Sequence, residues 1–162
     1  MAVYIGSNLM TGDSSSGSYK DMRIQNLIQK RPVGMLTNNG GVVSTPNTYP
    51  WNAKYLNYNN SGADTTNNRW TAQEPGVYVA MADLMTENNA YATDYYVLLL
   101  RNGGWYPCLC YTSNEGTYHM QMRVCATSYM GTGDYWSVYT QYGHDMYGNN
   151  QRYSRLVVAR LA

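Results

Sequence analysis

Apolar and polar positions alternate along most of this chain with a period of two, and turn residues interrupt the alternation. The longest run covers residues 77–84, where Val77, Val79 and Met81 fall on one face of an extended chain and Tyr78 opens the other face. Valine and tyrosine favour strands, and the preceding Pro-Gly dipeptide supplies a turn. Because both faces are apolar, we expect one of them to pack inside a two-sheet sandwich. The other face needs a second cover, for which another subunit is a candidate.

Turn signals divide the rest of the chain into short segments of strand-forming residues. Asn-Asn-Gly-Gly at 38–41, Arg-Asn-Gly-Gly at 101–104 and Gly-Thr-Gly-Asp at 131–134 are typical turns, and the second predicts a hairpin. Pro107 lacks a backbone donor, so we expect its strand at the edge of a sheet. About eight to ten short strands with no convincing long helix predict an all-β fold, an antiparallel sandwich with the jelly roll as the favoured topology.

Residues 1–31 differ in pattern from residues 32–162, which are expected to form the head domain. Residues 11–18 are a polar Gly/Ser-rich linker. Apolar residues at helical spacing follow, and they allow one or two helical turns before Pro32. We expect this N-terminal arm to anchor the head on a larger assembly; an arm folded back on its own domain, or a partly disordered one, fits the pattern equally well. The candidate capsid-anchor residues are Met22, Ile24, Leu27 and Ile28.

Composition limits the partners of the protein. Charged residues make up 13% of the 162 residues and the formal net charge is +1, so neither nucleic acid nor an anionic membrane is an expected partner. No apolar run approaches the roughly 20 residues of a membrane span, and the first residues lack the pattern of a signal peptide. The chain has 18 tyrosines and no phenylalanine, a bias that suits half-exposed strands and interfaces as well as an ordinary β-sheet core.

Cysteines and histidines are the first candidates for chemistry. Cys108 and Cys110 share a strand face. Free thiols in a reducing compartment are the favoured interpretation, and a bridge from Cys125 to Cys108 or Cys110 is the alternative. His119 and His144 have no metal-site spacing to these cysteines, and no nucleophile motif accompanies them. We therefore expect no metal site.

Three acidic residues near strand ends, Asp83, Glu87 and Asp94, could form a carboxylate pair. Acidic side chains at such positions are usually solvated, and we interpret these three in that way. Without an acid–base pair, a phosphate-binding loop or a nucleophile motif, the chain is not expected to be an enzyme or to need a cofactor.

Four short motifs follow one another along residues 33–162. They are Trp-Thr-Ala-Gln-Glu-Pro-Gly-Val-Tyr at 70–78, Leu-Leu-Leu-Arg-Asn-Gly-Gly at 98–104, Gly-Asp-Tyr-Trp-Ser-Val at 133–138 and the closing strand at 154–161. In order and spacing they resemble the C1q/tumour-necrosis-factor-like domain family. That family has an aromatic residue, Thr-Ala and Gly-x-Tyr at its third main strand, Lys/Arg-Asn-Gly at a strand end and Gly-Asp before its penultimate strand.

The resemblance implies a jelly roll of about ten strands that associates as a compact homotrimer. The chain departs from the family in its closing strand, which carries Arg155 and Arg160 and lacks the family's aromatic-Ser-Gly, and every family phenylalanine is replaced. Arg160 fits either a position near a threefold axis or one at an outer edge. Candidates for the sandwich core or the subunit contact are Tyr78, Ala80, Met120, Met122 and Val158, with the core favoured for the methionines.

The layout of an arm followed by one trimeric head favours a virion structural protein. We expect a bacteriophage capsid decoration (cement) or short head-fibre protein, assembled in the host cytoplasm, whose arm binds the major capsid protein or another virion protein. The alternative is a tail-fibre tip that binds a host receptor or host-surface glycan through loops 59–68 and 143–152. An intracellular bacterial domain of unknown partner, or an enzyme, is the third class.

Overall fold

The structure of the protein is a computed structural model. The chain divides into two compact units, Met1–Arg31 and Pro32–Ala162. The structure describes residues 3–5, 8–10, 32–43, 47–58, 62–86, 93–114, 119–141, 146–148 and 153–161. None of these residues belongs to a helix that could cross a membrane.

The N-terminal unit contains a small antiparallel hairpin. Strand β1 (Val3–Ile5) pairs with β2 (Asn8–Met10). The sequence pattern did not predict this hairpin, because three-residue strands are too short to display a period of two. A two-stranded hairpin is marginally stable alone in water. The candidate anchors between residues 22 and 28, and the helical turns expected there, lie outside the described residues.

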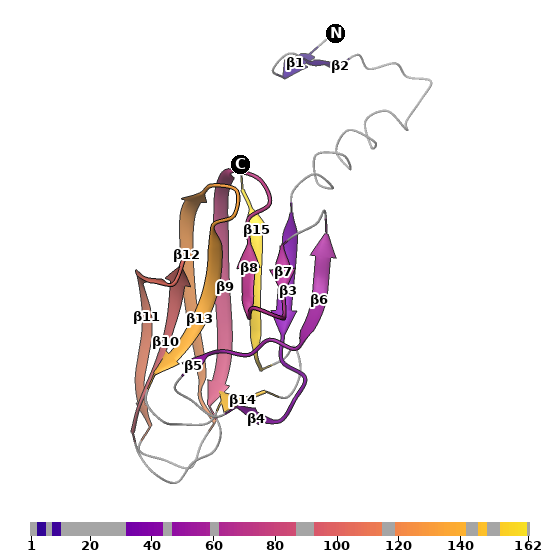
Figure 1. The fold of residues 1–162 in the computed structure, drawn as a ribbon. Helices are drawn as coiled ribbons and strands as arrows, with labels where there is room; N and C mark the ends of the chain where they lie inside the picture. The colour runs from indigo at the N-terminus through magenta and orange to yellow at the C-terminus, as the bar shows by residue number, and fades with distance from the viewer. Residues whose placement is uncertain are drawn as a thin grey trace. The chain divides into compact units, whose positions relative to one another are not determined.

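Two antiparallel sheets form the head (Figure 1). The six-stranded sheet has the order β11 (Gly104–Asn114), β10 (Thr93–Arg101), β13 (Tyr135–Gln141), β8 (Arg69–Thr71) and β7 (Ala63–Asp64), with β5 (Asn47–Thr48) beside β13. The seven-stranded sheet has the order β4 (Val42–Val43), β14 (Met146–Tyr147), β9 (Gly76–Thr86), β15 (Arg155–Arg160), β3 (Val33–Thr37) and β6 (Ala53–Tyr58), with β12 (Gln121–Met130) beside β9. The predicted all-β antiparallel sandwich is confirmed.

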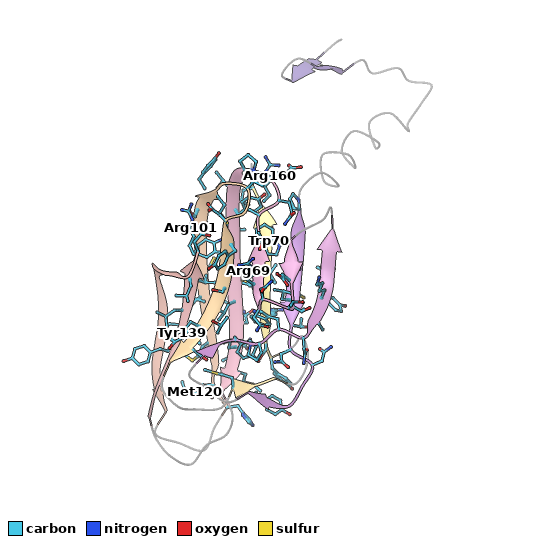
Figure 2. All side chains as sticks on the ribbon, in the orientation of Figure 1. Arg69, Trp70, Arg101, Met120, Tyr139 and Arg160 are labelled. Atoms are coloured by element: carbon cyan, nitrogen blue, oxygen red, sulfur yellow. The ribbon has the colours of Figure 1, made fainter. Side chains whose placement is uncertain are left out.

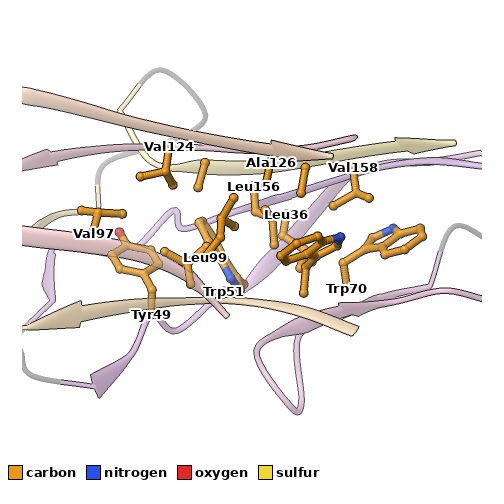
Figure 3. Close-up of a cluster of buried hydrophobic side chains, with 14 of the residues drawn as sticks. Leu36, Tyr49, Trp51, Trp70, Val97, Leu99, Val124, Ala126, Leu156 and Val158 are labelled. Carbon is orange, nitrogen blue, oxygen red and sulfur yellow. The ribbon is translucent and has the colours of Figure 1, made fainter. Parts of the chain in front are cut away.

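The core lies between the two sheets and holds the large buried side chains (Figure 3). Trp70 and Trp136 come from the six-stranded sheet, and Leu36 and Tyr78 come from the seven-stranded sheet; all four are 0% exposed. Trp51, in the segment before β6, is 1% exposed. Each buried aromatic side chain removes about 150–250 Å² from water, so tryptophan and tyrosine supply the core volume that phenylalanine supplies elsewhere.

Two local predictions about β10 and β11 are confirmed. The strands are joined by Asn102 and Gly103, with φ of 52° and 75°. Two successive left-handed residues are typical of a tight type I′ hairpin turn. Strand β11, which contains Pro107, lies at the edge of the six-stranded sheet. An edge strand has a neighbouring strand on one side only. A proline whose missing N–H faces the open side therefore removes no hydrogen bond between strands.

Candidate subunit interface

Strand β9 has two faces with different environments. Tyr78 and Ala80 are 0% exposed and pack in the core. Val77, Val79 and Met81 are partly exposed on the opposite side. The alternation therefore divides the strand as the sequence pattern predicted, and the described part of a single chain leaves the second face incompletely covered.

The outer face is the side of the seven-stranded sheet that points away from the core. Its apolar part extends across four strands, because the register places Val157 of β15 beside Met81 and Tyr129 of β12 beside Val77. Tyr129 is 62% exposed. The partly or fully exposed apolar residues of the outer face are Val33, Met35, Val77, Val79, Met81, Met85, Cys125, Tyr129, Val157 and Ala159.

One charged row crosses the outer face. Asp83 of β9 lies opposite Arg123 of β12 and Arg155 of β15. Nε of Arg123 donates to Oδ1 of Asp83, and Nε of Arg155 donates to Oδ2 over 2.7 Å. The Asp83 side chain is 0% exposed, whereas the side chains of Arg123 and Arg155 are 58% and 31% exposed. Two guanidinium groups thus cover one buried carboxylate.

The interpretation of Asp83 as a solvated strand-end residue is wrong. An unpaired buried carboxylate is unfavourable, and hydrogen bonds from two charged donors offset that penalty. The hydrogen bond to Asp83 raises the pKa of Arg123 above its ordinary value, so this arginine stays charged. The side chains of Glu87 and Asp94, the other members of the expected carboxylate group, lie outside those described.

Arg160, at the end of the closing strand β15 (Figure 2), contacts the connection between β8 and β9. Its guanidinium donates to the Glu74 carboxylate and, over 2.9 Å, to the backbone carbonyl of Pro75. The Tyr78 hydroxyl donates to the backbone carbonyl of Glu74 over 2.8 Å. Arg160 is therefore held within its own chain, at the end of the sheet and outside the charged row.

The residues predicted for the core or the subunit contact lie mainly on the inner side of the seven-stranded sheet. Tyr78, Ala80, Met122 and Val158 are at most 1% exposed. Met120 precedes β12 and is partly exposed, and its backbone N–H donates to a threonine hydroxyl of β9 over 2.9 Å. The outer-face residues were indicated in the sequence only by the alternation of β9. Which residues of β12 and β15 lie beside them is set by the pairing of strands that are far apart in the sequence, and no local pattern shows that pairing.

The described residues hold no group of three or more His, Cys, Asp or Glu side chains placed to bind a metal. His119 is exposed, and its Nδ1 lies 2.9 Å from a backbone carbonyl oxygen of β9. Cys110 is a free thiol packed against the core, so the alternative bridge from Cys125 to Cys110 is absent. The side chains of Cys108 and His144 lie outside those described.

No family model and no curated protein matches the sequence of the chain. Solved structures do match. Murine APRIL at pH 5.0 is 13% identical, with a TM-score of 0.68 over 82% of this chain and 100% of that one. The Eiger TNF of S. frugiperda is 14% identical, with a TM-score of 0.65 over 82% and 93%. The globular domain of the zebrafish complement 1qA protein is 13% identical, with a TM-score of 0.63 over 80% and 96%.

The protein has a C1q/tumour-necrosis-factor-like jelly-roll fold. The resemblance found in the motifs of residues 33–162 is confirmed at the level of the fold. At these identities a C1q/tumour-necrosis-factor-like fold is what the likeness establishes, and a fold of this kind does not determine the partner.

Proposed function

We propose that this protein is a non-enzymatic structural head that assembles into a homotrimer through its outer face. The supporting observation is the apolar surface beside β9, where Val77, Val79 and Met81 are partly exposed and Tyr129 is 62% exposed. Soluble monomers rarely expose a contiguous apolar patch of more than a few hundred Å². Covering such a surface with further copies contributes roughly 25 cal/mol for each Å² removed from water.

Three copies is the number that the family resemblance implies. Closed cyclic assemblies of identical chains are the common solution for soluble oligomers, because every copy then makes the same contacts. Tyrosine and methionine are enriched in protein interfaces, which agrees with the residues of the outer face.

We further propose that the trimer is part of a bacteriophage virion, as a capsid decoration (cement) or short head-fibre protein whose N-terminal unit binds the major capsid protein. The supporting features are the division of the chain into the units Met1–Arg31 and Pro32–Ala162 and the apolar residues in the sequence of the β1–β2 hairpin. A marginal hairpin gains stability when it docks on a surface. Three arms on one trimer also bind with avidity, because the second and third contacts are effectively intramolecular.

A tail-fibre tip that binds host glycans is the second candidate. Tyr55 of β6 is 57% exposed, and an exposed aromatic ring can stack on a sugar. A glycan array tests this role directly. Binding to host glycans would favour the tip over the decoration protein, and the absence of binding would favour decoration.

Size-exclusion chromatography with light scattering tests the trimer. Val79→Asp puts a charge into the outer face and should dissociate the trimer, whereas Thr132→Asp, in the exposed turn after β12, should leave it intact. A wild-type protein that is monomeric at every concentration would refute the assembly.

Deletion of residues 1–31 tests the anchor. The remaining head should stay trimeric but should no longer co-sediment with undecorated capsid shells. Shell binding by the truncated head would contradict the proposed role of the arm.

A further inference from the structure

In the described part of the head, each carboxylate that forms an ion pair has one guanidinium partner, with one exception. Among the described residues, three carboxylates have a single guanidinium partner each, whereas Asp83 has two. The single pairs are Asp64–Arg69, Glu74–Arg160 and Asp134–Arg101. The row of Asp83, Arg123 and Arg155 therefore carries one surplus positive charge.

Both arginines of this row contact Asp83 through Nε. Within the described part of the chain, no acceptor receives a hydrogen bond from the terminal nitrogens of Arg123 or Arg155. A guanidinium has five N–H donors in a planar fork that fits carboxylate and oxyanion geometry. Both side chains thus retain donors for a further anionic acceptor.

The surplus charge lies inside an apolar surface. Met81 and Met85 flank Asp83 on the same side of β9, and Val157 lies on that side of β15, beside Met81. When a second copy covers this surface, the surplus guanidinium loses its water, and a buried unpaired charge opposes association. An anion that accepts hydrogen bonds from both arginines relieves this opposition.

We propose that Arg123 and Arg155 bind one small inorganic oxyanion, of the phosphate or sulfate class, in the covered outer face, and that this anion strengthens association between copies. The inference rests on the proposed homotrimer. A carboxylate of the second copy has the same chemistry, but every described carboxylate outside this row already has a guanidinium partner. The inorganic oxyanion is therefore the favoured source.

Analytical ultracentrifugation of the full chain tests the proposal by comparing trimer dissociation in sodium chloride and in sodium phosphate at equal ionic strength. We expect phosphate to lower the dissociation concentration about ten-fold. Arg123→Gln removes the surplus charge and leaves Arg155 on Asp83, so the variant should fold, as circular dichroism can verify. Its trimer should form equally well in both salts. Arg69→Gln, which is outside the outer face, is the matched control and should keep the full phosphate effect.

Each contrary outcome has a distinct meaning. A wild-type trimer that dissociates equally in both salts overturns the anion site and leaves the trimer in place. If Arg123→Gln is weaker than the wild type by the same factor in chloride and in phosphate, so that it keeps the full phosphate effect, the acceptor is a carboxylate of the second copy, and the inorganic oxyanion is wrong. A monomer in every buffer refutes the homotrimer, and this inference with it.

Discussion

The indole of Trp70 packs against the ring of Tyr78, with ring centroids 5.0 Å apart and ring planes at 55°. Trp70 belongs to β8 in the six-stranded sheet and Tyr78 to β9 in the seven-stranded sheet, and both side chains are 0% exposed. The segment 72–75 carries the chain from one sheet to the other, with its bend at Gln73 and Glu74 and not at the expected Pro-Gly turn, because Gly76 already belongs to β9. The aromatic pair fills the core beside this crossing.

This contact predicts a large difference between two substitutions of Tyr78. Tyr78→Phe keeps the ring and loses the hydroxyl bond to Glu74, so it should lower the free energy of unfolding by about 1 kcal/mol. Tyr78→Ala leaves a cavity against Trp70 and should lower it by about 3–5 kcal/mol. Urea denaturation measures both, at one fixed protein concentration because association stabilises the folded chain. Equal losses would mean that the ring packing contributes little.

The sequence predicted both faces of β9 but not the charged row that crosses its outer face. Alternation is a local property, so Val79 and Tyr78 could be assigned to opposite faces from their neighbours alone. Asp83 is separated from Arg123 by 40 residues and from Arg155 by 72, and no local pattern indicates that the three strands lie side by side in this register.

Short strands were missed for a related reason. Strands β4, β5, β7 and β14 have two residues each, which is too few to show a period. For this reason residues 59–68 were expected to be a polar loop throughout, whereas Ala63 and Asp64 form β7. Turn residues were better guides, because Asn102 and Gly103 adopt conformations that few other residues tolerate.

Gly62 and Gly133 offer a matched pair of substitutions by alanine. Both have a left-handed backbone, with φ of 74° and 90°. A Cβ on Gly62 would lie 1.6 Å from the carbonyl oxygen of Thr71, whereas a Cβ on Gly133 would meet nothing within 4 Å. Gly133→Ala should therefore lower the free energy of unfolding by about 1–2 kcal/mol, because alanine disfavours this backbone conformation. Gly62→Ala must also move β7 away from β8, so it should lower the free energy of unfolding by at least about 3 kcal/mol. Thermal and urea unfolding measure the difference, and similar losses would contradict the close approach.

Tyr49 predicts a loss of stability in alkali. Burial raises the pKa of its hydroxyl to about 12, above the ordinary 10.0. The neutral form is thus favoured in the folded state, and the corresponding stability is fully present below pH 10 and is lost as the pH rises towards 12. Relative to Tyr49→Phe, the wild type should lose roughly 2–3 kcal/mol over this interval. Unfolding curves of both proteins at pH 8, 10 and 11.5 test this, because the other tyrosines are common to both. A constant difference between the two proteins would contradict it.

Asp134 predicts the opposite dependence in acid. Its carboxylate accepts hydrogen bonds from Nδ2 of Asn102 and Nη2 of Arg101, both over 2.8 Å, and from the backbone N–H of Gly131 over 2.9 Å. These donors favour the charged form and lower the pKa of Asp134 to about 2. The stability from this lowered pKa is present above the ordinary value near 4 and is lost as the pH falls towards 2.

Asp134→Asn keeps the shape of the side chain and removes its charge. Because the group lies at the surface, solvent screening limits the effect, and the variant should be less stable by roughly 1 kcal/mol at pH 7. The difference in free energy of unfolding between the wild type and the variant should narrow between pH 4 and pH 2.5, where the wild-type carboxylate begins to take up its proton. Urea unfolding at pH 7, 4 and 2.5 measures it. A difference that stays constant over this range would show that the loss of an acceptor oxygen, and not the loss of the charge of Asp134, weakens the contacts between the β10–β11 and β12–β13 turns.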